Sequence, residues 1–269
     1  MDLVTIAVLV LTGIGVGFAS GLLGVGGCFI MVPVLYWIYS AVLDPKVAIL
    51  TAFGTNLGVV FPTAISGAYR HSKKKAVNFR IALVIGAFGA LGAVFGSTVA
   101  TFLPAKILKT AFAIVIIASA IRMLTSKPPK ESKAVGNPIL WAILGFIAGA
   151  FSGFVGIGGG VIIVPILAII VGLRIHEAVG TSTAVMAFTS LAGLIGYILN
   201  GLRDGIFGCF PVGHLVGYFN PESCLALAVT SVPMAQVGAT FGHVLPAKWL
   251  KLAFVVVMLY MAMKMLGVL

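Results

Sequence analysis

Acidic side chains are scarce in this sequence of 269 residues, which has six of them against 17 lysines and arginines. Charged residues make up 9% of the chain, whereas a soluble domain carries about 25%. Hydrophobic residues make up 61%, and the mean hydropathy is +1.20. The chain therefore cannot cover a water-facing surface, and we expect it to fold in lipid. The acids, which all fall in loops or at the ends of apolar runs, are Asp2, Asp44, Glu131, Glu177, Asp204 and Glu222.

The sequence also lacks the residue patterns of catalytic and metal sites. It has no paired carboxylates, no Ser/His/Asp set and no HExxH motif, and Cys28, Cys209 and Cys224 lack metal-ligand spacing. We therefore expect no enzyme, no cofactor and no metal. The net charge of +11 does not indicate nucleic-acid binding, because the basic residues cluster in short loops between apolar runs, as cytoplasmic anchors do.

What the sequence does contain is a glycine-rich interruption of an apolar run, present twice. Residues 17–35 (GFASGLLGVGGCFIMVPVL) and 149–167 (GAFSGFVGIGGGVIIVPIL) are identical at ten of nineteen positions. A second match joins residues 96–112 to 238–254, which share LPAK. The spacing grows between the two matches because the second half has a longer loop at 200–219. The chain is therefore duplicated, and an interruption repeated in both halves of a membrane protein is typical of a binding site at the repeat interface.

A helix needs about 20 residues to cross the hydrocarbon core. Spans of this kind are expected at 3–23, 47–69, 80–101, 105–123, 138–156, 177–199, 221–243 and 248–268. A shorter apolar piece follows each glycine break, at 28–40 and 160–173. We predict an all-α polytopic membrane protein with a first repeat at 1–124, a cytoplasmic linker at 125–137 and a second repeat at 138–269.

The basic loops favour an inverted relation of the two repeats. Residues 70–80 hold five lysines and arginines, which predicts a cytoplasmic loop. The equivalent loop after Asn200 holds only Arg203, beside Asp204. If equivalent loops lie on opposite sides of the membrane, each repeat must cross it an odd number of times, which here means five. The alternative, four crossings with re-entrant short pieces, gives nearly the same total charge balance and stays open.

The glycine breaks are the first candidate site. Glycine allows backbone turns that other residues cannot adopt, and the helix that restarts after each break has N–H groups without an intrahelical partner. Such a terminus attracts anions. Ser20 and Ser152, one turn before the breaks, could add hydroxyl donors. The substrate-binding candidates in the breaks are Gly24, Gly26, Gly27, Gly156, Gly158, Gly159 and Gly160.

Glycine in a membrane helix also has a purely structural explanation. Gly13, Gly17 and Gly21 recur every four residues, as do Gly145, Gly149 and Gly153, which predicts close-packed helix faces. The breaks fall off this spacing. Further polar candidates, which serve equally well as helix caps or interhelical hydrogen bonds, are Thr51, Thr55, Asn56, Thr181, Ser182, Thr183 and Gln236.

The duplicated glycine motif resembles the sulfite exporter TauE/SafE family of membrane proteins. The segment HEAVGTSTAVMAFTSLAGLIGYILNG and the two LPAK turns are similar to it as well. The resemblance implies a multi-pass permease of the cytoplasmic membrane for small sulfur-containing anions such as sulfite or organosulfonates. The first repeat departs from the pattern, with AILTAFGTN where the second has EAVGTSTAV, and with Cys28 where the second has Gly160.

We therefore expect a secondary transporter that moves a small anion by alternating access around the paired breaks. Its expected partners are the substrate and the lipid bilayer, and a homo-oligomer is compatible with the sequence. The alternatives are an anion channel, a carrier of another small anion such as a carboxylate, a membrane scaffold or sensor, and a cation carrier. A cation carrier would need the short helices to present carbonyl groups to the site.

Overall fold

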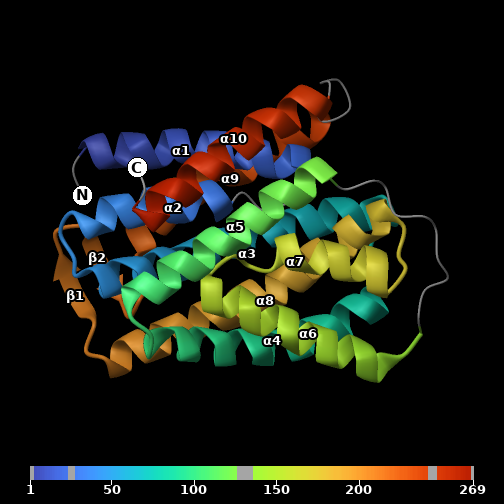
Figure 1. Ribbon diagram of the computed structural model, residues 1–269, viewed down its shortest axis with the longest axis horizontal. Coiled ribbons are helices and arrows are strands. Elements are labelled where there is room, and N and C mark those ends of the chain that lie inside the picture. The colour runs from blue at the N-terminus through green and yellow to red at the C-terminus, as the bar shows by residue number, and fades with distance from the viewer. Residues whose placement is uncertain (1–2, 24–27, 126–135, 242–246, 268–269) are drawn as a thin grey trace.

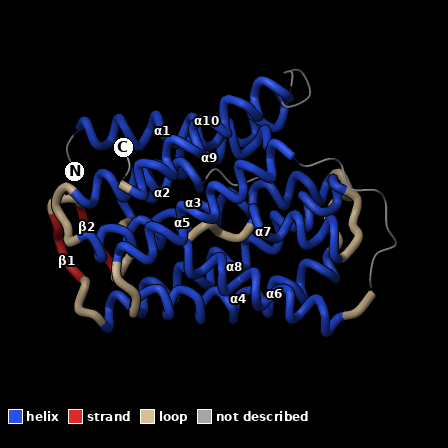
Figure 2. Tube along the Cα trace, viewed as in Figure 1, coloured by secondary structure: helices blue, strands red, loops and turns tan. Residues whose placement is uncertain are grey.

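The computed structural model describes residues 3–23, 28–125, 136–241 and 247–267. The first half contains α1 (Leu3–Leu23), α2 (Cys28–Ser40), α3 (Pro45–Lys73), α4 (Phe79–Thr101) and α5 (Ala105–Thr125). The second half contains α6 (Pro138–Val155), α7 (Gly160–Pro165), the π-helical turn η1 (Ile166–Ile170), α8 (Ile175–Arg203), β1 (Phe207–Phe210), β2 (Gly213–Val216), α9 (Pro221–Phe241) and α10 (Ala247–Leu266). Figures 1 and 2 show helices that lie along one long axis, with the hairpin at one end.

Within the described residues, four helices are long and apolar enough to cross a membrane: α3, α4, α6 and α8. Cys28–Ser40 and Gly160–Ile170 are shorter apolar helices, as expected from the sequence. Large apolar side chains of the outer helices stand exposed, among them Val4, Leu91 and Ile139. In water these side chains would be costly, but in a bilayer they face acyl chains. The prediction of an all-α multi-pass membrane protein is confirmed.

The two halves exchange their most extensive helix contacts. Helix α1 of the first half packs on α9 of the second, and α6 of the second half packs on α4 of the first. Glycines make the close approach: Gly149 and Gly153 lie directly against the backbone of Gly89 and Ala93, and Gly17 lies against the backbone of Ser231. The predicted close-packed glycine faces are confirmed for these residues. An exchange of equivalent contacts supports a twofold relation of the repeats, whose inverted orientation stays a prediction.

Helices α3 and α8 pack against each other at the centre of the molecule. Residues 48–60 of α3 are all buried, although this stretch includes Thr51, Thr55 and Asn56. A helix that is buried all round lies in the core of its protein, and polar side chains there need partners or a ligand. The centre of the molecule therefore holds three of the polar candidates of the first repeat, Thr51, Thr55 and Asn56.

Helix α8 connects two different ends of the molecule. Near its start, Gly180 packs against Ala76 and His71 of the basic loop. Near its end, Gly201 packs against Gly217 and Tyr218, which follow the hairpin. A helix rises 1.5 Å per residue, so these two contacts are separated by about 30 Å, the thickness of a hydrocarbon core. The basic loop and the hairpin thus lie at opposite ends, and α1 begins and α10 ends at the hairpin end (Figure 1).

This separation predicts opposite accessibility for two positions. Cys209 in β1 is exposed, and Lys74 is exposed in the basic loop. We expect a membrane-impermeant maleimide to label native Cys209 on intact cells. In a Cys209→Ser background, a cysteine introduced by Lys74→Cys should react only after permeabilisation. Cys209→Ser alone controls for buried Cys28 and half-buried Cys224. Labelling of both positions from one side would contradict the inverted topology.

Residues 200–219, predicted as a loop, contain a β-hairpin. Strands β1 and β2 pair antiparallel, with Phe207 opposite Val216 and Phe210 opposite Gly213. Leu215 and Tyr218 belong to the main apolar core, so this segment is packed into the bundle. Four-residue strands are too short to give a clear period-two pattern. The three cysteines are free thiols.

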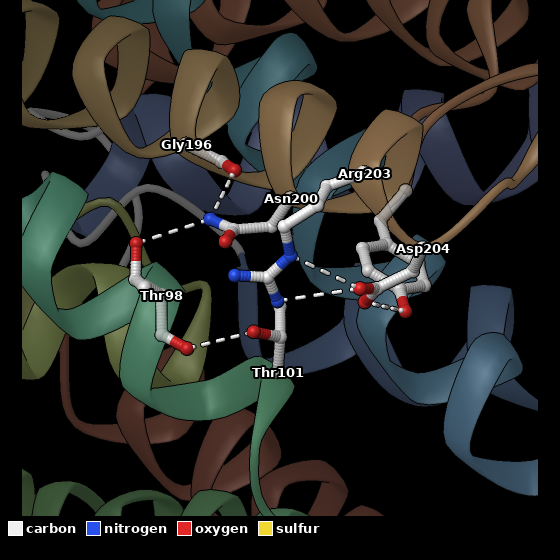
Figure 3. Close-up of polar contacts among 7 residues, drawn as sticks. Thr98, Thr101, Gly196, Asn200, Arg203 and Asp204 are labelled. Carbon is white, nitrogen blue, oxygen red and sulfur yellow. Dashed lines mark hydrogen bonds and ion pairs between the residues drawn. The ribbon is translucent and has the colours of Figure 1, made fainter.

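A cluster of polar side chains joins the hairpin end of α8 to the end of α4 (Figure 3). Asn200 donates through Nδ2 to Thr98 Oγ1 at 3.0 Å and to the Gly196 carbonyl at 2.7 Å. Arg203 forms an ion pair with Asp204 at 3.2 Å, and Asp204 accepts a hydrogen bond from the Tyr218 hydroxyl at 2.8 Å. Burial, together with this bond to a carboxylate, raises the pKa of Tyr218. The cluster ties α8, α4 and the hairpin segment together.

Candidate functional site

The glycine break of the second half is resolved in full. Helix α6 ends at Val155, and Gly156 follows in the left-handed region with φ 65°. Gly158 and Gly159 also have positive φ values, of 77° and 91°. The chain then restarts as a helix at Gly160 and continues to Ile170. The predicted interruption is therefore present, and glycine is required there because other residues rarely adopt these angles.

The break is wedged between α3 and α8. A Cβ atom on Gly156 would lie 2.5 Å from Phe53 Cβ, and one on Gly158 would lie 2.7 Å from Val60 Cγ1. On the other side, Gly160 faces the Met186 sulfur of α8. Residues 155–160 are all buried. The missing glycine side chains thus allow backbone to enter the centre of the bundle, where its polar groups need partners.

The carbonyl groups of the break have such partners. The Gly156 carbonyl accepts a hydrogen bond from Asn56 Nδ2 at 2.6 Å, and the Gly158 carbonyl accepts one from Thr189 Oγ1 at 3.0 Å. One turn earlier, the Gly153 carbonyl accepts a bond from the Tyr197 hydroxyl at 2.8 Å. Three side chains of α3 and α8 therefore satisfy the carbonyls of Gly153, Gly156 and Gly158.

The N–H groups on the other side of the break are in a different situation. The Gly159 carbonyl accepts from the N–H groups of Ile162 and Ile163, at 3.0 and 2.8 Å, so the new helix begins there. The N–H groups of Gly159 and Gly160 come before the first N–H group that is bonded within the new helix. They have no acceptor among the described residues. Free N–H groups at the start of a helix carry partial positive charge.

Two buried side-chain atoms beside the break also lack a partner. Ser152 is fully buried, its Oγ has no hydrogen bond, and it lies 3.4 Å from the position of a Cβ atom on Gly159. Asn56 Oδ1 is buried and unpartnered as well, although Nδ2 of the same amide is bound to Gly156. The structure therefore brings together Ser152, Asn56 and the glycines of the second break, which the sequence offered as separate candidates.

The first break is described only at its borders. Helix α1 ends at Leu23 and α2 begins at Cys28, so the interruption predicted here separates two helices. Gly24, Gly26, Gly27 and the side chain of Ser20 lie outside the described residues. A role for these four residues stays a prediction.

Thr51 and Thr55 lie one turn apart on the buried part of α3. Thr55 Oγ1 accepts hydrogen bonds from the Asn220 N–H at 3.1 Å and from the Tyr39 hydroxyl at 3.5 Å. Thr55 therefore joins α3 to α2 and to the segment after the hairpin. Thr51 Oγ1 is buried and has no hydrogen-bond partner.

Thr181, Ser182 and Thr183 lie away from the break, at the start of α8. The Thr181 hydroxyl accepts from the Asn78 N–H at 3.0 Å, which connects α8 to the N-terminus of α4. Ser182 and Thr183 donate to carbonyls of their own helix, at 2.8 and 2.7 Å. These contacts match the cap and interhelical alternative of the sequence analysis.

Gln236 is exposed on α9, and its Nε2 donates to Ser66 Oγ of α3 at 3.2 Å. Its backbone carbonyl accepts a bond from Arg70 at 3.2 Å. Gln236 thus binds the part of α3 that leads into the basic loop. The structure places its amide among protein partners, apart from Asn56 and Ser152.

Sequence reasoning missed Thr189, Tyr197 and Met186, which border the break from α8. Thr189 carried a usable signal, since a hydroxyl within an apolar span needs a partner. Tyr197 and Met186 did not, because aromatic and sulfur-containing residues are ordinary in apolar helices.

The break and its surroundings are suited to binding an anion without a counter-ion. Acidic side chains in the described part of the chain lie at helix ends or in loops, and Lys264 lies over the Trp37 ring near the C-terminus. Groups of His, Cys, Asp and Glu that could hold a metal ion are not found among the described residues. Binding would therefore rely on N–H and hydroxyl dipoles in a region of low dielectric, where such dipoles act strongly.

Comparison with known proteins agrees with this architecture. The family model described as Sulfite exporter TauE/SafE matches residues 9–265. The chain is 31% identical to a probable membrane transporter protein of Methanocaldococcus jannaschii over 252 residues, which cover 93% of this chain and 91% of the relative. It is 30% identical to a probable membrane transporter protein of Bacillus subtilis over 243 residues, which cover 88% of this chain and 90% of the relative. No solved structure matches. The chain belongs to the sulfite exporter TauE/SafE family of membrane transporters.

Proposed function

We propose that this membrane transporter is a secondary transporter of small sulfur-containing anions, such as sulfite or organosulfonates, with its substrate site at the glycine breaks. The observation that carries the proposal is the unequal satisfaction of the second break. Its carbonyls at Gly156 and Gly158 are bound to side chains, whereas the N–H groups of Gly159 and Gly160 have no acceptor among the described residues. A segment arranged in this way offers donors to a ligand.

The same observation argues against a cation carrier. A cation would be bound by carbonyl oxygens, as at the unwound segments of sodium-coupled transporters. Here Asn56, Thr189 and Tyr197 donate to the carbonyls around the second break. Sulfite and sulfonates instead have several anionic oxygens close together, which several N–H groups and a hydroxyl can bind at once. The sulfur chemistry itself rests on family membership.

Alternating access requires that the site can be exposed to either side. The exchanged helix pairs α1–α9 and α4–α6 are held by glycine contacts and flank the α3–α8 centre, with α4 packed on α8 and α9 packed on α3. The break has helical contacts on both sides, to α3 and to α8. In this proposal, a shift of these helices relative to one another exposes the break first to one side of the membrane and then to the other.

The test is ligand stabilisation followed by flux. In a thermal-shift screen of the purified protein, we expect sulfite, thiosulfate or sulfoacetate to raise the melting temperature more than sulfate or simple carboxylates. A ligand at about 100 times its Kd stabilises the folded state by about 2.7 kcal/mol. The best ligand should then enter proteoliposomes with saturable kinetics. A shift by carboxylates alone, or single-channel conductance instead of saturable flux, would contradict the proposal.

A further inference from the structure

Only one end of the Asn56 side-chain amide has a hydrogen-bond partner. Its Nδ2 is committed to the Gly156 carbonyl at 2.6 Å, and because a carbonyl only accepts hydrogen bonds, this contact fixes which end of the amide is nitrogen. The other end, Oδ1, is a buried acceptor without a donor. The amide therefore borders the break with an oxygen atom that can only accept a hydrogen bond.

An unpartnered buried amide oxygen is costly, so its persistence needs an explanation. It is not a sign of poor packing in this region, because Thr189 and Tyr197 satisfy the neighbouring carbonyls. Four buried side-chain atoms lack a partner in the described part of the chain, and two of them, Asn56 Oδ1 and Ser152 Oγ, lie beside this break. The unsatisfied atoms thus gather where the backbone donors are also free.

The three kinds of free group have different requirements. The N–H groups of Gly159 and Gly160 can only donate, Asn56 Oδ1 can only accept, and the Ser152 hydroxyl can do either. An oxyanion without a hydrogen-bond donor would satisfy the N–H groups and bring its lone pairs toward Asn56 Oδ1. A ligand with both anionic oxygens and a donor would satisfy all of them.

We infer that Asn56 is a specificity-determining residue that selects oxyanions carrying a hydrogen-bond donor, such as a hydroxyl or an acidic proton, over oxyanions that carry none. This inference rests on the proposed anion site at the second break. It goes further in assigning different roles to the two ends of one side chain. Nδ2 donates to the Gly156 carbonyl of the break, and Oδ1 accepts a hydrogen bond from the ligand.

Two sulfonates of the same charge and nearly the same size test the inference. In 2-hydroxyethanesulfonate a hydroxyl group takes the place of the terminal methyl group of propane-1-sulfonate. We expect the purified wild-type protein to bind the hydroxylated compound at least about tenfold more tightly, measured as half-saturating concentration in thermal-shift titrations. In Asn56→Leu the preference should fall to about twofold or less, because the amide acceptor is removed.

Thr189→Val is the matched control, since it removes the partner of the Gly158 carbonyl as Asn56→Leu removes the partner of Gly156. We expect Thr189→Val to keep the tenfold preference. Loss of the preference in both variants would assign it to the shape of the break and overturn the role of Asn56. Where Asn56→Leu does not fold, the wild-type comparison still tests the inference, because equal binding of the two sulfonates overturns it.

The remaining outcomes separate this inference from the proposed function. Equal binding of the two sulfonates, or binding of sulfite with neither sulfonate, overturns the selection by Asn56 and leaves the anion site standing. Absence of binding by sulfite and by both sulfonates overturns the anion site and the inference together.

Discussion

Gly159→Val is expected to reduce anion flux into proteoliposomes by at least tenfold while the protein remains folded. Gly159 has φ 91°, where a β-branched residue is strongly disfavoured. A Cβ atom there would also lie 2.7 Å from Ile163 Cδ1 and 3.4 Å from Ser152 Oγ. The substitution therefore moves the start of the helix and the free N–H groups away from Ser152. Flux at equal protein density is the measurement.

Gly205→Val is the matched control for Gly159→Val. Gly205 has φ 77°, in the same left-handed region, but a Cβ atom there would meet nothing within 4 Å. Both variants carry backbone strain of about 1–2 kcal/mol. Only Gly159→Val disturbs the break, so Gly205→Val should transport at close to the wild-type rate. Normal flux in Gly159→Val would remove the break from the transport mechanism.

Gly149→Val is expected to destabilise the protein more than any other change considered above. Gly149 lies in α6 against α4, and a Cβ atom there would lie 2.6 Å from both Gly89 C and Gly89 Cα. Backbone cannot move aside as a flexible side chain can, so the helices would have to separate. Overpacking typically costs about 1–3 kcal/mol, and contact between two backbones is at the upper end of that range.

The measurement for Gly149→Val is the melting temperature in detergent and the yield of monodisperse protein. Gly15→Val in α1 is the control, because Gly15 is exposed and a Cβ atom there has open space. We expect Gly15→Val to melt within about one or two degrees of the wild type, because surface substitutions usually change stability by less than about 0.5 kcal/mol. An equal fall in both variants would mean that glycine-mediated contact between α4 and α6 does not stabilise the fold.

The helical architecture could be predicted because its signals are local. Hydropathy indicated the spans, and the glycines off the four-residue spacing marked an interruption that the structure has between Val155 and Gly160. The short piece predicted at 28–40 coincides with α2 (Cys28–Ser40). Chain duplication then predicted the second copy of each feature. Helices α3 and α8 are longer than predicted, because polar residues at their ends remain helical beyond the apolar part.

The site was predictable only in part, because its contacts are long-range. Asn56 lies 100 residues from Gly156 in sequence, and no local pattern joins them. The polar candidate Thr181, near the start of α8, has a partner away from the break, because its hydroxyl accepts a hydrogen bond from the Asn78 N–H. Thr51 and Thr181 align in sequence, yet the hydroxyl of Thr181 is satisfied and that of Thr51 is not. Duplication predicts equivalent positions, whereas partners depend on how the halves meet.

The segment after the hairpin restricts how α3 can move. Asn220 donates from its backbone to Thr55 and from Nδ2 to the Val212 carbonyl, and its Oδ1 accepts from Ser223 at the start of α9. Gly54 lies directly against the Tyr218 carbonyl. Sliding of α3 along its own axis would break these contacts together, so the hairpin segment and the first turn of α9 oppose such a movement. A displacement of the segment after the hairpin is therefore expected to shift Thr55 and, with it, the neighbouring Asn56.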